Sequence, residues 1–320
     1  MHRRNFLPAI LIAIALLGAA CGDDDDTAVE DAPSSDDVTD STDAGGESDF
    51  PVTIESDGGT WTLEAAPQRV VSLSPAATET LFAIGAGSQV VAVDTYSYFP
   101  EEAPVTDLSG FDPNVEAVTA FEPDLVVLAN DANELVAALT ALDIPVLVST
   151  APVDIESGYA TMAELGLATG HVDETAAAIA TMRAEIEVAL ASAPESSARI
   201  YHELGDSFYS ASSFGFVGAV YAEMGATNIA DQADSDQGGF PQLTEEYIIE
   251  ADPQLIVITD QAGYTVDDVL SRPGWGEIAA IANGDVVVVD TDIASRWGPR
   301  LPQFITAVAE ALNTLTVSAS

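Results

Sequence analysis

The sequence contains no lysine, and its cations are eight arginines and three histidines, against 53 aspartates and glutamates. A formal net charge of −45 repels nucleic acid and anionic lipid, and it also keeps copies of the chain apart. A nucleic-acid-binding role is therefore not expected, and the protein is expected to be a monomer.

Cysteine occurs once, at Cys21, so the sequence offers no disulfide framework and no thiolate cluster for a metal centre. The preceding stretch "MHRRNFLPAILIAIALLGAA" has a basic start, an apolar run and small residues at its end, which is the layout of a cleaved export signal. Because "LLGAAC" is similar to a lipobox, residues 1–20 are expected to be removed and Cys21 to be lipidated. "RRNFL" also resembles a twin-arginine motif, so the export route stays open.

Large apolar residues are scarce in residues 21–49, so this lipidated segment is expected to be a disordered acidic linker. Folding is expected to begin near Phe50, where "FPVTIESDGGTWTLE" predicts two strands about a turn at Gly58 and Gly59.

From Arg69 onward, short Val- and Leu-rich runs alternate with helical segments. Strands without polar alternation are typical of a parallel sheet that is covered on both faces. The pattern predicts an α/β fold with two Rossmann-like lobes, residues 50–160 and 196–320. The connecting helical segment, residues 161–195, holds one long helix at 173–193, so large hinge closure is not expected.

A sixteen-residue repeat relates the two predicted lobes: "NVEAVTAFEPDLVVLA" (114–129) and "TEEYIIEADPQLIVIT" (244–259) align without a gap. Asn114 and Thr244 are natural N-caps, which places Glu116 and Glu246 in the first turn of each helix. The repeat indicates a pseudo-twofold relation. Each glutamate either complements the positive end of its helix or is a docking point for a partner.

Several segments together resemble the substrate-binding proteins that serve ABC importers of cobalamin and ferric siderophores. They are "PQRVVSLSPAATETLFAIGAG", "YSYFP", the two repeats and "DIASRWGPR". The resemblance implies two α/β lobes bridged by one long helix, with a ligand cleft between the lobes. It also implies that Glu116 and Glu246 dock on permease arginines, and that the protein captures a corrinoid or a ferric siderophore outside the cell membrane, either lipid-anchored or periplasmic.

Two of the scarce arginines stand together in "DTDIASRWGPRLP" (290–302), which predicts a locally positive site for phosphate, carboxylate or hydroxamate groups. Arg296 could instead form a surface salt bridge, and Arg300 a structural ion pair. Phe111 is the nearest aromatic residue where cobalamin binders tend to have a tryptophan. The expected ligand-binding residues, several of them by resemblance, are Tyr96, Phe208, Phe240, Asp292, Arg296, Trp297 and Arg300.

Catalytic motifs are missing, because the sequence has no G-x-S-x-G elbow, no Walker motif and no dinucleotide fingerprint. An enzyme is therefore not expected, and neither a cofactor nor a protein-bound metal ion is predicted. The alternative that stays open is a zinc or manganese binder of similar architecture. After the export signal, His171 and His202 are the only histidines that could bind such a metal ion, and each can also be explained as a structural residue.

Overall fold

The computed structural model describes residues 50–318, which belong to one compact unit, residues 45–320. The export signal, Cys21 and the linker lie outside the described residues. Between residues 50 and 318, no helix combines the length and the apolar character that crossing a membrane requires.

An antiparallel hairpin precedes the first sheet, with β1 (Val52–Ser56) and β2 (Gly59–Leu63) paired as the sequence predicts. The first sheet is parallel throughout, in the order β4-β3-β5-β6. Its strands are β3 (Val70–Leu73), β4 (Val90–Val93), β5 (Leu125–Leu128) and β6 (Val146–Val148). Nearly every residue in them is buried, which explains the lack of polar alternation.

The second sheet is also parallel and repeats the topology of the first. Its order, β8-β7-β9-β10, matches β4-β3-β5-β6 strand for strand. Its strands are β7 (Arg199–His202), β8 (Thr227–Asn228), β9 (Leu255–Thr259) and β10 (Val286–Val289). The shared order agrees with the pseudo-twofold relation predicted from the repeat.

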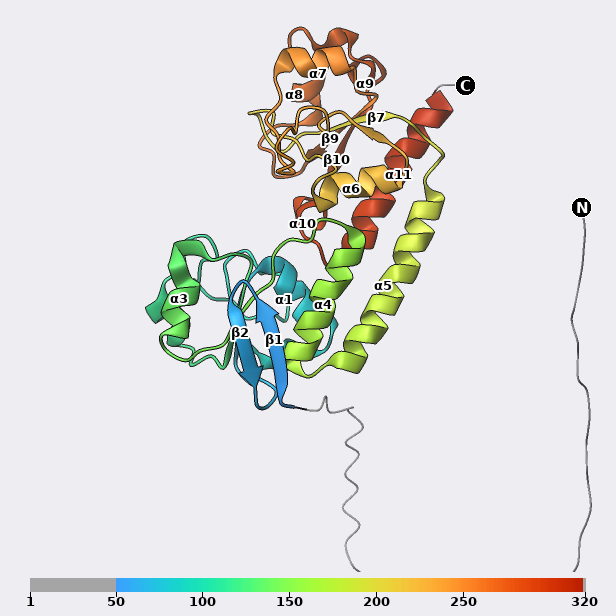
Figure 1. Ribbon diagram of the computed structural model, residues 1–320. Coiled ribbons are helices and arrows are strands. Elements are labelled where there is room, and N and C mark those ends of the chain that lie inside the picture. The colour runs from blue at the N-terminus through green and yellow to red at the C-terminus, as the bar shows by residue number, and fades with distance from the viewer. Residues whose placement is uncertain (1–49, 319–320) are drawn as a thin grey trace, which may run out of the picture. The chain divides into compact units, whose positions relative to one another are not determined.

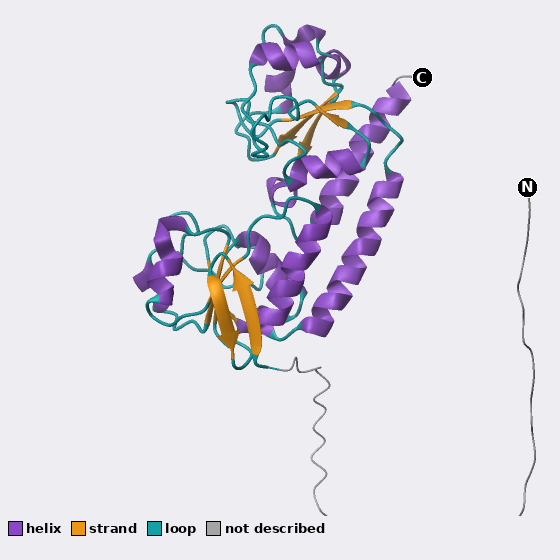
Figure 2. Ribbon diagram, viewed as in Figure 1, coloured by secondary structure: helices purple, strands orange, loops and turns teal. Residues whose placement is uncertain are grey.

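Helices cover both sheets (Figures 1 and 2). Those of the first lobe are α1 (Pro75–Ala83), α2 (Val115–Thr119) and α3 (Leu135–Thr140). The second lobe has α6 (Phe216–Glu223), α7 (Glu245–Ala251), α8 (Val266–Leu270), α9 (Ala279–Asn283), α10 (Thr291–Ser295) and α11 (Leu301–Ser318). Three short 3-10 helices span Ala86–Gln89, Ala132–Glu134 and Trp275–Glu277.

The long connecting helix is α5 (Val172–Ser192), and it packs against α4 (Ile155–Thr169) and α11 (Figure 1). Met182 and Ile186 of this helix, four positions apart on one face, are buried. Together α4, α5 and α11 belong to one hydrophobic cluster that includes residues of both sheets. The outer face of each sheet has a separate cluster. The lobes are thus joined by packed helices and a shared core.

Candidate ligand-binding cleft

A cavity of about 420 Å³ lies between the lobes. From the first lobe it is lined by the start of α1 and by loops that follow β4, β5 and β6. From the second lobe it is lined by α10 and by residues after β9 and β10. Loops at the carboxyl ends of parallel strands therefore meet there from both sheets, which is where ligands bind in open α/β folds.

Aromatic side chains from the first lobe form an exposed part of this lining. Tyr96, Tyr98 and Phe111 are 52%, 55% and 76% exposed, and all three line the cavity. The Tyr96 and Phe111 rings meet edge to face with centroids 5.5 Å apart. Such ring faces can stack on a flat ligand. Phe111 lines the cavity although it was not among the ligand-binding residues predicted from the sequence.

Trp297 lines the cavity from the second lobe, but most of its side chain is buried. Its ring meets Tyr159 of α4 edge to face at 5.6 Å. A Cβ atom at Gly158 would fall 1.8 Å from Trp297 Cε2, so only glycine lets the indole approach the helix. Trp297 is thus packed against α4 and also borders the cavity.

Three predicted ligand residues, Phe208, Phe240 and Arg300, lie outside the lining of this cavity. Phe208 adopts a positive φ of 60° and packs 6.0 Å from Trp275, close to the Arg272 guanidinium. Phe240 is 55% exposed. The structure therefore brings together Tyr96, Asp292, Arg296 and Trp297 in the lining, but it places neither phenylalanine nor Arg300 there.

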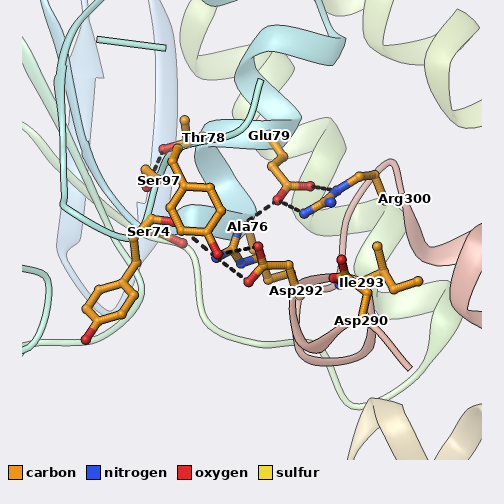
Figure 3. Close-up of polar contacts among 12 residues, drawn as sticks. Ser74, Ala76, Thr78, Glu79, Ser97, Asp290, Asp292, Ile293 and Arg300 are labelled. Atoms are coloured by element: carbon orange, nitrogen blue, oxygen red, sulfur yellow. Dashed lines mark hydrogen bonds and ion pairs between the residues drawn. The ribbon is translucent and has the colours of Figure 1, made fainter. Parts of the chain in front are cut away.

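The two clustered arginines converge on one buried acid, Glu79 of α1. Figure 3 shows the pair that Arg300 forms with Glu79. Arg296 Nη1 lies 2.9 Å from Glu79 Oε1, while Arg300 forms two bonds to the same carboxylate at 2.8 and 2.6 Å. Glu79 is 3% exposed. Arg300 is therefore ion-paired, as one of the two sequence interpretations held, and the contact joins the lobes.

Asp292 completes this charged cluster at the cavity wall. Its Oδ1 lies 2.7 Å from Arg296 Nη2, and its Oδ2 accepts a hydrogen bond of 2.5 Å from Tyr98. That bond raises the pKa of Tyr98, which keeps the hydroxyl protonated as the donor. Two carboxylates thus face two guanidiniums, so the positive site predicted from the sequence is wrong, because Glu79 and Asp292 neutralise it.

Arg296 nevertheless keeps hydrogen-bond donors for a ligand. Its Nη1 donates one N–H to Glu79 and its Nη2 donates one to the Tyr96 carbonyl oxygen, while Asp292 Oδ1 pairs with Nη2 at 2.7 Å. Among residues 50–318, Nε–H and the second N–H of Nη1 have no hydrogen-bond acceptor. Arg296 therefore lines the cavity with N–H groups that the described chain does not use, in a cluster whose two negative and two positive charges balance.

The other arginines of the described chain are also committed within the protein. Arg183 pairs with Glu156, and Arg272 pairs with the fully buried Glu203. Arg69 donates to the carbonyl oxygens of Phe121 and Glu122, while Arg199 donates to those of Ala251 and Asp252. Within residues 50–318, scarce cations are thus used to fix elements to one another.

Arg69 and Arg199 extend the repeat, because the two arginines are 130 positions apart, which is also the separation of the N-caps Asn114 and Thr244. Each ties the end of α2 or α7 to the first strand of its own sheet. The helices begin as predicted: Asn114 accepts from the Ala117 amide at 2.9 Å, and Thr244 accepts from the Tyr247 amide at 3.2 Å. Glu116 and Glu246 lie exposed in the first turns, without an ion pair among the described residues.

The two histidines lie apart from the cavity lining. His171 precedes α5 and places Nδ1 3.0 Å from the Thr169 carbonyl oxygen. His202 ends β7, buried, with Nδ1 2.6 Å from the Tyr221 hydroxyl. In the described range, no group of three or more His, Cys, Asp or Glu side chains could hold a metal ion. Nothing in this geometry favours the zinc or manganese alternative.

Burial of His202 makes the stability of the fold sensitive to acid. Burial lowers the pKa of His202 to about 4, below the unfolded value of about 6.5. Because the unfolded chain binds the proton first, this contribution is complete above about pH 6.5, and as much as ~3 kcal/mol is lost as pH falls toward 4. Urea unfolding at pH 7 and pH 4.5 is expected to show a smaller loss for His202→Asn than for wild type. Equal losses would contradict the assignment.

Comparisons with known proteins agree with this architecture. Residues 70–293 match the periplasmic binding protein family. The chain is 30% identical over 330 residues to a cobalamin-binding protein of Halobacterium salinarum, covering 99% of this chain and 87% of that protein. It is 28% identical to YvrC, an uncharacterized ABC transporter substrate-binding lipoprotein of Bacillus subtilis, with 98% of each covered.

Two solved structures superpose on the chain. The periplasmic vitamin B12 binding protein BtuF of Vibrio cholerae gives a TM-score of 0.67 at 22% identity, over 78% of this chain and 98% of that one. The periplasmic heme-binding protein RhuT of Roseiflexus sp. RS-1 gives 0.68 at 24%, with the same coverage. The chain belongs to the periplasmic binding protein family, which confirms the predicted family and fold class.

Proposed function

We propose that the protein is an extracytoplasmic lipoprotein that captures a corrinoid and delivers it to the permease of an ABC importer. The observation that carries this proposal is the cleft between the lobes, where exposed aromatic faces stand beside a charge-neutral wall with free N–H donors. A corrinoid is a large ring fringed with neutral amides, so stacking and N–H donors are the contacts that it needs.

The name of the Halobacterium relative supports the same ligand, because that protein aligns with nearly the whole chain. Ferric siderophores, many of which are anionic, fit the neutral wall less well. Both were open from the sequence, and the arrangement of Glu79 and Asp292 around the arginines favours the corrinoid.

A fluorescence titration tests the ligand. Trp297 lines the cavity, so cyanocobalamin is expected to quench tryptophan emission with a saturable curve, and Trp297→Phe should remove part of that quenching. Haemin and a panel of ferric siderophores serve as competitors. Saturation by a siderophore with no response to cyanocobalamin would contradict the corrinoid proposal.

Docking to the permease is proposed through Glu116 and Glu246. They occupy equivalent exposed positions on α2 and α7, and each helix is fixed to its own sheet by an arginine. A partner with its own twofold symmetry could therefore meet both acids at once. Like charges on the two lobes match paired basic sites on such a partner.

Anchoring is proposed through Cys21, following the small residues that end the export signal. Cys21→Ser is expected to block lipid attachment and to release the protein from the membrane fraction, as measured by immunoblotting after fractionation. Unchanged processing and membrane retention in this variant would show that another segment holds the protein.

A further inference from the structure

Glu79 is the one acid in α1 whose side chain meets both clustered arginines, yet it does not line the 420 Å³ cavity. Arg296 and Asp292 do line it. Glu79 therefore lies behind the wall that a ligand would touch, and it acts on the cleft through the guanidinium groups.

The charges of this cluster cancel. Glu79 and Asp292 supply two negative charges, while Arg296 and Arg300 supply two positive ones. No cation of the wall is left to neutralise an anionic ligand.

We propose that Glu79 determines ligand specificity by neutralising Arg296 and Arg300, so that the cleft accepts an uncharged chelate and rejects one with carboxylate or catecholate anions. The inference rests on the proposed function in taking a metal chelate as the ligand. An anion that enters a partly buried cleft loses hydration, and only an unpaired cation would repay that loss. A neutral amide carbonyl needs no more than an N–H donor, and Arg296 retains two.

The test uses probe pairs that differ in carboxylate charge. One pair is cyanocobalamin and its monocarboxylic acid, and the other is haemin dimethyl ester and haemin. Calorimetry on the wild type should show the neutral corrinoid bound about tenfold more tightly than its acid. Glu79→Gln removes one negative charge, so that preference should fall about tenfold, toward equal affinity.

A second variant separates charge from structure. Glu79→Gln/Arg300→Gln restores the balance between Arg296 and Asp292, so the preference for the neutral probe should return, which a purely structural role of Glu79 does not predict. Glu156→Gln, which removes the carboxylate charge from another ion pair with arginine, is the matched control and should change nothing. Circular dichroism and thermal unfolding establish that each variant is folded.

The outcomes distinguish the two proposals. An unchanged preference in folded Glu79→Gln, or one that the double variant does not restore, overturns the inference even if cyanocobalamin binds well. Absence of corrinoid binding by the wild type overturns the proposed function, and the haem pair then still measures the effect of Glu79. If the wild type binds neither probe pair, both the assumption that the ligand is a metal chelate and the inference about Glu79 are wrong.

Discussion

Reversing the charge of both docking candidates, with Glu116→Arg and Glu246→Arg, is expected to abolish uptake of the ligand while its affinity stays within about twofold. Both side chains are exposed on helices at the surface, and neither lines the cavity. An exposed ion pair contributes only about 0–1 kcal/mol, so a single reversal should have a modest effect and both must be changed. Uptake of labelled cobalamin by cells and titration of the purified protein measure the two quantities.

The matched control reverses two other exposed acids, Glu64→Arg and Glu223→Arg, one in each lobe. This variant changes the net charge equally and should transport normally. Retained uptake in the Glu116/Glu246 variant would remove these acids from the docking surface. A loss of ligand affinity would instead place them in the binding site.

The second large effect is expected at Arg296. Arg296→Ala should weaken ligand binding by about 10- to 150-fold, roughly 1.5–3 kcal/mol, because the ligand loses charged N–H donors. Arg296→Lys should recover only part of this, since an ammonium cannot hold Glu79, Asp292 and a ligand in one plane. Calorimetry measures the affinity of each variant.

Arg300→Ala is the comparison, because Arg300 touches Glu79 but does not line the cavity. It should lower the free energy of unfolding by about 1–3 kcal/mol, as Glu79 keeps only one partner. Its effect on affinity should be smaller than that of Arg296→Ala. Unchanged affinity in Arg296→Ala would leave the cluster as a purely structural contact between the lobes.

Local patterns were sufficient for much of the fold. Uninterrupted Val and Leu runs predicted parallel sheets, and the polar residues Asn114 and Thr244 predicted the starts of two helices that the structure confirms. These features depend on neighbouring residues, so the sequence carries them directly. The same holds for the long helix, which differs from its predicted bounds by one residue at each end.

The wall of the cleft could not be predicted in the same way. Glu79 and Arg296 are 217 positions apart, and no local pattern joins them. The signal that the sequence offered was a single charged residue in the otherwise uncharged stretch "PAATETLFA", because a buried carboxylate requires a partner. Likewise, nothing in the sequence around Gly158 predicts that the indole of Trp297 packs against it.

The arginine clamps on α2 and α7 have a mechanical consequence. Because Arg69 and Arg199 tie the ends of α2 and α7 to β3 and β7, Glu116 and Glu246 are expected to move together with the sheets of their lobes. The distance between these two carboxylates would then depend on the angle between the lobes. For a permease that binds both acids, a change of that angle would change the distance between its two contacts. Even a small rotation of the lobes on ligand release would therefore strain the contact.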